Sequence, residues 1–319
     1  MNRGIYNIGN TCYLNSVIQC ITHLNTFNKH VTNPGKFYNS WIKLTNDITD
    51  NIKSPLNIKY FIEEFNKSLL NSNMYFESFY QNDACEFITV LFQLLHDSIK
   101  EERNMVIEGI PQNNNDKIAI KCLQIWKKHF ENDYSYIISN SYSQIYNNTQ
   151  CPQCNYITSN YDPINIIPLS LQLSDTTIYD CLNTFIKREG LDNSNQWKCD
   201  NCNNYVNPIR SSKFWNLSDI LIIQLKIYSN NRKLDTNIQY PDILQMDDYN
   251  INYNQLSNSY KLYGLCIQSG NLNSGHYISI CYNHILDKWF IYNDDSIHEV
   301  HHSNVFTNKP YCLFYKRIS

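Results

Sequence analysis

Residues Gly4–Ser16 read GIYNIGNTCYLNS and place one cysteine, Cys12, between a polar turn and an apolar run. The residues before Cys12 have a turn composition, and the apolar residues after it recur at helical spacing. Thr11 is the expected N-cap, which puts Cys12 in the first helical turn, where the helix dipole favours a thiolate. The amide of Asn7 can direct an N–H at an oxyanion beside the sulfur. The alternative is a small buried apolar residue, the usual environment of a free cysteine.

A second pair of stretches decides between these interpretations. Residues 274–277 read SGHY, and residues 289–294 read WFIYND. A cysteine, a histidine and a side-chain amide or carboxylate form the Cys-His-Asn version of the nucleophile triad. Cys12 is therefore predicted to be a nucleophile and His276 its base.

These stretches resemble the Cys box and the His box of ubiquitin-specific proteases, and the similarity runs from Gly4 to about Arg317. The resemblance implies a thiol-dependent deubiquitinase that hydrolyses the peptide or isopeptide bond after the C-terminal glycine of ubiquitin. It also assigns the orienting residue to Asn293, which follows the aromatic residue of the His box. Adjacent side chains of a strand point to opposite faces, so we expect Asn293 to face His276 and Asp294 to support the site from behind.

The resemblance extends to the expected substrate-binding residues. The segment QNDACEF (81–87) resembles the family's QQDAHEF, whose acidic residue contacts the basic tail of ubiquitin, and this implies the same role for Asp83. Asp83 is also a suitable N-cap for the helix that follows. Gly275 and Tyr277 flank His276, and a glycine suits a place where the substrate backbone passes closely. The chain departs from the family at Gln268, where histidine is common, and at Ile227–Tyr228, where the family has Arg-Phe.

Two Cys-x-x-Cys pairs suggest a metal site. Cys151 and Cys154 form one pair, and Cys199 and Cys202 form the other. Two such pairs supply the four thiolates of a structural zinc site, whereas a redox role is the alternative for a single pair. In the resembled family this Zn²⁺ lies at the tip of a fingers lobe, and four thiolates leave no open position for catalysis. The other cysteines lie in apolar or helical contexts and are expected in the core.

Length and composition limit the class of protein. A chain of 319 residues can form one multi-lobed catalytic unit, and a net charge of −3 gives no indication of nucleic-acid binding. It lacks an apolar stretch of membrane-spanning length and an apolar signal region, so we expect an intracellular location, in the cytoplasm or nucleus. We also expect a monomer. Its high content of Asn, Ile and Tyr is typical of proteins encoded by AT-rich genomes, such as those of some protists and large DNA viruses. If the protein is viral, the expected location is the host cell.

Local patterns predict most of the elements. Helices are expected after Cys12, over 58–70 and from 79 onward, with an irregular connector up to about 57 that contains a short helical turn at Trp41–Leu44. Residues 118–130 fit a helix or a strand, and strands are expected from Tyr134. A buried strand over 220–228, a hairpin of 277–281 with 288–292, and a final strand over 310–316 that closes the sheet complete the pattern. The hairpin would bring His276 and Asn293 to one end of a sheet.

The predicted fold is α+β and papain-like, with a helical thumb, a β-sheet palm and zinc-tipped β fingers. We expect one catalytic domain over 1–319, divided into a thumb (1–133), mainly fingers (134–245) and a palm with the His box (246–319). The expected partners are ubiquitin and ubiquitinated proteins, with no nucleic acid and no membrane. Two alternatives stay open: a protease for another ubiquitin-like modifier, and a non-catalytic ubiquitin-binding module.

Overall fold

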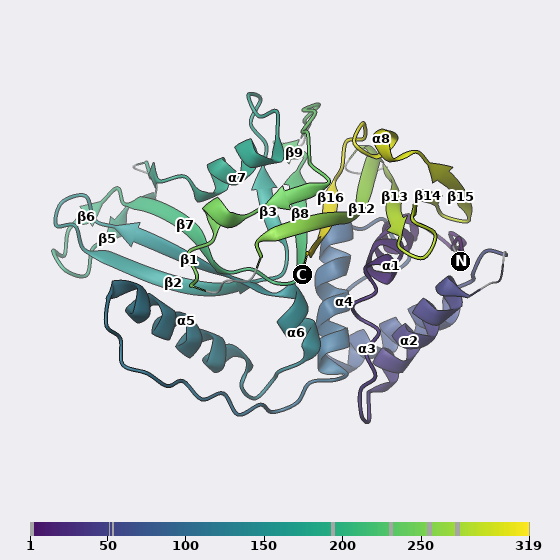
Figure 1. The fold of residues 1–319 in the computed structure, drawn as a ribbon, viewed down its shortest axis with the longest axis horizontal. Coiled ribbons are helices and arrows are strands. Elements are labelled where there is room, and N and C mark those ends of the chain that lie inside the picture. Colours follow the sequence, from purple (N-terminus) through teal and green to yellow (C-terminus); the bar gives the residue numbers. More distant parts are fainter. Residues whose placement is uncertain are drawn as a thin grey trace.

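The computed structural model describes residues 3–50, 52, 54–192, 195–229, 232–253, 257–271 and 275–318. The first helices and the last strands of the chain lie together at one end of the molecule, and the middle of the chain extends to the other end (Figure 1). The helices are α1 (Cys12–Leu24), α2 (Lys36–Thr49), α3 (Lys59–Asn71), α4 (Ala84–Asp97), α5 (Asn114–Phe130), α6 (Tyr136–Ser141), α7 (Ile178–Ile186) and α8 (His302–Val305), with a 3₁₀ turn at Asp247–Tyr249. The predicted α+β class is confirmed.

Helix α1 is the centre of the helical end, because every one of its residues is buried. It packs between α4 and the strands that carry His276. Thr11 occupies the N-cap position as predicted, but its side chain makes no capping bond to the helix. Instead the Thr11 hydroxyl accepts from the backbone N–H of Ile8 at 3.2 Å and contacts Asn7 Oδ1 at 3.3 Å. The threonine therefore stabilises the turn before the helix.

Three segments differ from the sequence predictions. The expected irregular connector contains α2, a full helix whose apolar residues at 37, 38, 41, 44 and 48 form one buried face. Its asparagine-rich flanks hide this periodicity. Residues 118–130, which were ambiguous, belong to α5, and α6 precedes the first of the strands expected after Tyr134. Both helices begin at polar caps, Asn113 and Ser135.

The described residues form an eight-stranded sheet in the order β15-β14-β13-β12-β16-β8-β3, with β11 paired to β12. Its strands are β3 (Ile167–Ser170), β8 (Ile220–Lys226), β11 (Ile243–Gln245), β12 (Ser259–Gly270), β13 (Gly275–Asn283), β14 (Lys288–Asn293), β15 (Ser296–Val300) and β16 (Cys312–Arg317). β13 and β14 form the predicted antiparallel hairpin. The final strand, β16, lies between β12 and β8 rather than at an edge, which explains its almost complete burial.

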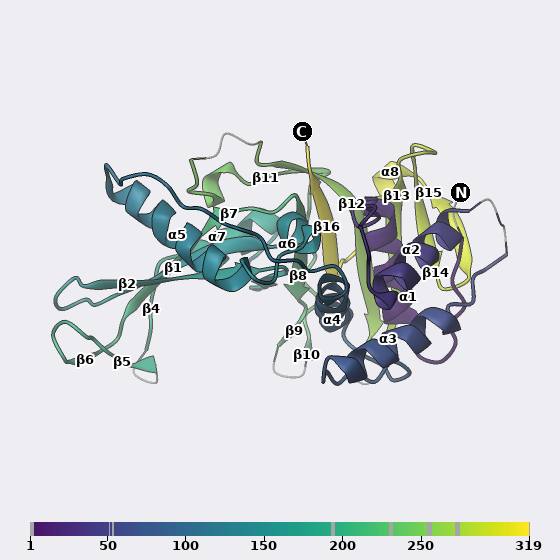
Figure 2. The same cartoon turned by 90° about the horizontal axis from the view of Figure 1, so that it is seen from below.

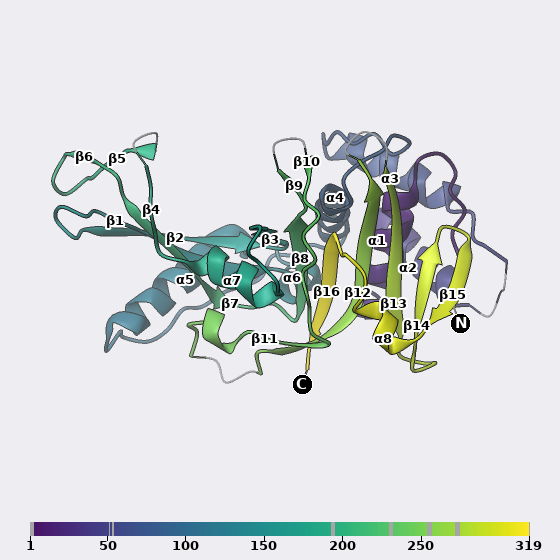
Figure 3. The same ribbon diagram turned by 90° about the horizontal axis from the view of Figure 1, so that it is seen from above.

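A second sheet, in the order β2-β1-β7-β4, forms the opposite end. Its strands are β1 (Ser143–Gln150), β2 (Ile157–Ile164), β4 (Glu189–Gly190) and β7 (Ile209–Asn216). Two short ribbons join β5 (Trp197–Lys198) to β6 (Tyr205–Val206) and β9 (Tyr228–Ser229) to β10 (Arg232–Lys233). Helix α5 runs along this sheet, where Cys122 packs with Tyr161 and Trp215 (Figure 2). The β5–β6 and β9–β10 ribbons project from the same side of the molecule (Figure 3).

The lobe boundaries expected at 133 and 245 do not coincide with the sheets. β3 and β8 come from the range assigned to the fingers, yet they belong to the large sheet. Helix α5 comes from the range assigned to the thumb, yet it packs on β2. Strand partners are chosen by non-local packing, so consecutive residue ranges cannot delimit these lobes. Within the described residues, no helix is long and apolar enough to span a bilayer.

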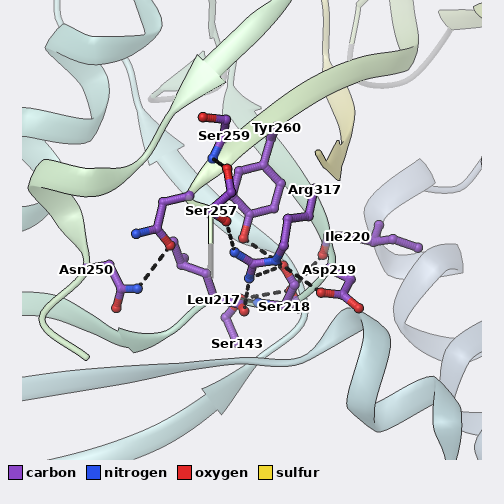
Figure 4. Close-up of polar contacts among 11 residues, drawn as sticks. Ser143, Leu217, Ser218, Asp219, Ile220, Asn250, Ser257, Ser259, Tyr260 and Arg317 are labelled. Atoms are coloured by element: carbon purple, nitrogen blue, oxygen red, sulfur yellow. Dashed lines mark hydrogen bonds and ion pairs between the residues drawn. The ribbon is translucent and has the colours of Figure 1, made fainter. Parts of the chain in front are cut away.

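Arg317 holds the junction of the two sheets together (Figure 4). Its guanidinium, with a side chain only 10% exposed, pairs with Asp219 at 3.1 Å and donates to the carbonyl oxygens of Leu217 and Ser257. It also lies 4.8 Å from the ring centroid of Tyr260. These partners come from both sides of the junction, so one planar donor links the carbonyl oxygen of the buried Leu217 to that of the exposed Ser257.

We predict that Arg317→Met lowers the free energy of unfolding by about 1–3 kcal/mol, because buried carbonyl oxygens lose their donor. Urea denaturation followed by tryptophan fluorescence measures this change. Lys288→Met is the control, because its ion pair with Glu299 is exposed on both sides and should contribute less than about 1 kcal/mol. Equal stability of the Arg317→Met and Lys288→Met proteins would contradict the assignment.

Candidate active site

The N-terminal segment is fixed against the turn that follows β14. A Cβ atom added at Gly4 would lie 2.3 Å from the carbonyl oxygen of Asp295, so only glycine fits there. The next residue, Ile5, donates its backbone N–H to the carbonyl of Asp294 at 2.9 Å. This close approach brings the turn before Cys12 to the end of the strand that carries Asn293.

Cys12 lies at the start of α1, and its side chain is nearly buried. Burial raises the pKa of the Cys12 thiol; the backbone N–H of Tyr277 opposes this effect, and the nearby Asp294 charge adds to it. The sequence-based expectation that the helix N-terminus would favour the thiolate is therefore not met in the resting protein. The physical reason is that burial raises the thiol pKa by more than the nearby backbone N–H groups lower it.

His276 and Asn293 are in direct contact. The Nε2 atom of His276 lies 2.6 Å from Oδ1 of Asn293, the contact expected from the sequence register. The hairpin pairs Ser279 with Tyr292, which brings the two residues to the same end of the sheet. If Nε2 carries the proton donated to Asn293, Nδ1 is the ring nitrogen left to accept a proton. The amide thus fixes both the tautomer and the orientation of the ring.

Asp294 turns away from His276 and contacts the Cys12 segment. Its backbone adopts a left-handed conformation with φ of 51°, which ends the strand. One carboxylate oxygen accepts from the amide of Asn15 at 2.8 Å and the other from the amide of Asn7 at 3.0 Å. Asp294 therefore joins the end of β14 to helix α1 and to the preceding turn.

The orientation of Asn7 is fixed by its neighbours. Its side-chain oxygen accepts from the backbone N–H groups of Gly9 and Thr11, at 3.2 and 3.1 Å, while its nitrogen donates to Asp294. The amide oxygen therefore points into the turn and the exposed amide nitrogen points outward. A second N–H on that nitrogen is available in this orientation, because an amide carries two donor hydrogens.

A pocket of about 240 Å³ brings together several predicted site residues. Cys12, Asp83, Gly275 and Tyr277 all line it. Asp83 caps α4 as predicted, with its carboxylate accepting from the backbone N–H groups of Cys85 and Glu86 at 2.7 and 3.1 Å. It also accepts from the hydroxyl of Tyr311. Ser274, the first residue of the SGHY motif, lies outside the described residues.

Sequence reasoning missed Gln81, which lines the same pocket. Its side-chain oxygen accepts the backbone N–H of Gly275 at 3.2 Å. The contact links the segment before α4 to the strand of His276 across residues far apart in the chain. Its position beside Asp83 was the only local signal.

The four cysteines of the two Cys-x-x-Cys pairs meet at the far end of the small sheet, and their sulfur atoms all lie within 4.8 Å of one another. Tetrahedral zinc with Zn–S bonds of about 2.3 Å requires sulfur atoms roughly 3.8 Å apart. The Cys151–Cys202 and Cys154–Cys199 distances are 3.8 and 3.6 Å. The donor set therefore fits a structural Zn²⁺ ion.

Both knuckles have the same backbone geometry. Each ends in an asparagine with positive φ, Asn155 at 57° and Asn203 at 58°. Each asparagine donates its N–H to the carbonyl of the first cysteine of its pair, at 3.0 and 2.8 Å. Asparagine tolerates this left-handed conformation better than most residues, and the tight turn points both thiols of a pair in one direction.

Comparisons with known proteins agree with this geometry. The profile of the family described as "Ubiquitin carboxyl-terminal hydrolase" matches residues 3–315. Ubiquitin carboxyl-terminal hydrolase 2 from Homo sapiens is 25% identical over 353 aligned residues, covering 99% of this chain and 55% of that protein. The probable ubiquitin carboxyl-terminal hydrolase R319 from Acanthamoeba polyphaga mimivirus is 24% identical over 424 aligned residues, covering 98% of this chain and 90% of that protein.

A solved structure has the same fold. A chain in the SAGA Ubp8/Sgf11/Sus1/Sgf73 DUB module bound to ubiquitin aldehyde superposes with a TM-score of 0.72, at 23% identity, covering 99% of this chain and 70% of that one. This chain spans about half the length of the curated hydrolase 2 relatives that it matches. The family profile nevertheless covers almost all of its residues, and the chain belongs to the ubiquitin carboxyl-terminal hydrolase family.

Proposed function

We propose that this chain is a thiol-dependent deubiquitinase that hydrolyses the peptide or isopeptide bond after the C-terminal glycine of ubiquitin. The observation that carries the proposal is the 2.6 Å contact between His276 and Asn293, beside the pocket that Cys12 lines. Membership of the hydrolase family supports it, and so does the likeness to a chain whose structure holds ubiquitin aldehyde.

The reaction follows from the positions of these groups. Nδ1 of His276 accepts the thiol proton of Cys12, and the sulfur attacks the carbonyl carbon of the terminal glycine. The tetrahedral intermediate collapses to a thioester as the imidazolium returns that proton to the leaving amine. Water, deprotonated by His276, then cleaves the thioester and releases the carboxylate and the free thiol. Asn293 holds the imidazole in one orientation through both steps.

Asn7 and Asp294 act on the charge that develops on the carbonyl oxygen. The outward N–H of Asn7 supplies the oxyanion donor, and Asp294 keeps the amide in place through its 3.0 Å contact. Asp294 therefore acts through Asn7 rather than on His276. Its contact with Asn15 fixes the same carboxylate to α1.

The pocket residues suit a thin, basic peptide tail. Asp83 and Glu86 place two acidic side chains in the wall, and basic side chains of the ubiquitin tail would be attracted to them. Gly275 and Tyr277 line the same pocket next to Cys12. Gly275 projects no side chain into the passage proposed for the Gly-Gly end of the tail, and the Gln268 amide fills the space that a Cβ would take.

Two alternatives are kept. Another ubiquitin-like modifier with a similar tail would meet the same pocket, and only a panel of modifier probes separates the two substrates. A non-catalytic ubiquitin-binding module is disfavoured because Cys12, His276 and Asn293 are all present. We further infer that one structural Zn²⁺ ion is bound by the four clustered cysteines, and that the protein is an intracellular monomer whose partners are ubiquitin and ubiquitinated proteins. A relative from a virus makes the host cell one plausible location.

We predict that Cys12→Ala abolishes turnover of a ubiquitin–fluorophore substrate while the circular dichroism spectrum stays unchanged. An electrophilic ubiquitin probe should form one adduct, at Cys12, in the wild type. Mass spectrometry of the labelled peptide measures this. Cys281→Ala is the matched control, because that thiol is fully buried and should not affect labelling. Turnover by the folded Cys12→Ala protein would refute the mechanism.

Asn293→Ala should lower kcat by roughly 10- to 100-fold, because a misdirected imidazole loses its alignment with the thiol. Asn293→Asp should retain substantial activity, since a carboxylate oxygen can accept the same N–H. Steady-state kinetics on the ubiquitin–fluorophore substrate compares the two. Full kcat in a folded Asn293→Ala protein would remove Asn293 from the triad.

Metal analysis of the purified protein should find one zinc per chain, and Cys151→Ser should lose it. The substitution should destabilise the small sheet first, because the ion closes a long loop there. Cys122→Ser is the control, since this buried cysteine lies outside the cluster and its loss should leave the metal content unchanged. A zinc-free wild type with full stability and activity would contradict the prediction.

A further inference from the structure

Gln268 separates two cavities. This buried side chain, on β12, lines the pocket that contains Cys12 and also a second cavity of about 490 Å³. Apolar residues, among them Leu225 and Ile238, line the second cavity together with two lysines, Lys233 and Lys309. A buried amide in this position needs several hydrogen-bond partners to offset the loss of water.

The partners come from the β9–β10 ribbon. The side-chain oxygen of Gln268 accepts from the hydroxyl of Tyr228 at 2.9 Å and from Nζ of Lys233 at 2.7 Å. Lys233 also donates to the backbone carbonyl of Gln268 at 2.6 Å. Its hydrogen bonds, within the part of the chain described, thus go to uncharged oxygens. Charge-assisted bonds of this kind are stronger than neutral ones, so they hold the ribbon firmly to β12.

Gln268 in turn packs against the strand of the catalytic histidine. β12 and β13 pair Ser269 with His276 and Gly270 with Gly275. A Cβ built on Gly275 would lie 2.3 Å from Nε2 of Gln268, so the amide occupies the space beside the Gly275 backbone. The same nitrogen donates to the carbonyl of Asn271 at 3.2 Å, which fixes the start of the turn. Any displacement of Gln268 is therefore passed directly to the start of β13.

Gly275 is also held from the opposite side. Its backbone N–H donates to Gln81, which belongs to the segment before α4. The residue before His276 thus contacts Gln81 from the helical end and lies beside Gln268 of β12, which the β9–β10 ribbon holds in place. Loss of either the Gln81 or the Gln268 contact would allow the start of β13 to shift.

We propose that Lys233 and Gln268 are positioning residues for His276, so that the β9–β10 ribbon sets the reactivity of Cys12. The proposal rests on the role given to His276 under the proposed function. The contacts of Gln268 with Tyr228 and Lys233 are called the bridge below. Tyr228 and Gln268 are positions at which this chain departs from the family pattern, so the bridge depends on residues particular to this chain. It acts through alignment: the Cys12 thiol, whose burial disfavours the thiolate, ionises only when the imidazole is in place.

Two variants break the bridge, and one controls for it. Lys233→Met removes the cation, and Gln268→Leu removes the amide while retaining an apolar side chain of related size. Lys309→Met is the matched control, because this lysine lines the same cavity but its ion pair is with Asp235. Gln268→Glu is a second, milder variant that retains an acceptor for Lys233 and Tyr228.

Two measurements separate positioning from folding and from substrate binding. The rate of Cys12 alkylation by iodoacetamide, read by mass spectrometry without ubiquitin, reports thiolate formation. Kinetics on a ubiquitin–fluorophore substrate report kcat and KM. Lys233→Met and Gln268→Leu should lower both the alkylation rate and kcat by roughly 10- to 100-fold. KM should change by less than about twofold. Gln268→Glu should lie between them and the wild type, and Lys309→Met should match the wild type.

Unchanged alkylation and unchanged kcat in folded Lys233→Met and Gln268→Leu proteins would overturn the proposal. A rise in KM alone would also overturn it, because the bridge would then shape the substrate pocket instead. Should the wild type fail to turn over ubiquitin, the proposed function fails. The alkylation rates still decide the bridge, since they need no ubiquitin.

Discussion

The position of Cys12 relative to His276 and Asn293 depends on contacts between the N-terminal segment and the turn after β14. These contacts are called the seam here. Cys12 lies near the first residue and Asn293 near the last, and the carboxylate of Asp294 joins them through Asn7 and Asn15. The backbone of Gly4 must approach Asp295 so closely that no side chain fits. The charge-assisted hydrogen bonds of Asp294 and the close approach of Gly4 to Asp295 thus act at the same place. Together they fix the position of the Cys12 segment relative to the end of β14. The large sheet and α1 provide the rigid elements on which this seam rests.

Local signals were sufficient for the parts of the site that follow each other in the chain. The turn and apolar run around Cys12 gave the helix start, and alternation along 277–292 gave a hairpin with His276 and Asn293 at one end. Period-two geometry required that only one of Asn293 and Asp294 face the histidine, and the resemblance to the His box indicated Asn293, which contacts His276 in the structure. The cysteine pairs gave the metal-site geometry, since two knuckles restrict where four sulfur atoms can lie.

Features that depend on distant partners were beyond local reasoning. Arg317 satisfies carbonyls in two other segments, and β16 lies inside the sheet because β8 pairs on its other side. Lys233 belongs to no motif, and Gln81 was only the first residue of the QNDACEF segment; their importance comes from contacts with Gln268 and Gly275. Helix α2 was missed for a different reason, because its polar residues face water and dilute an otherwise regular apolar spacing. Strand order also differs from sequence order, because β3 and β8 join the large sheet from the middle of the chain.

The pKa of Cys12 connects these points. Helix position alone favours ionisation, but burial acts in the opposite direction and is the larger effect in this site. In the proposed mechanism, the imidazolium of His276 stabilises the buried thiolate as an ion pair. Ionisation of the thiol therefore depends on the position of His276. Asn293 orients that ring directly, and the contacts on either side of Gly275 hold the strand from which it projects. Under the proposed mechanism, a misaligned histidine leaves Cys12 protonated and therefore unreactive.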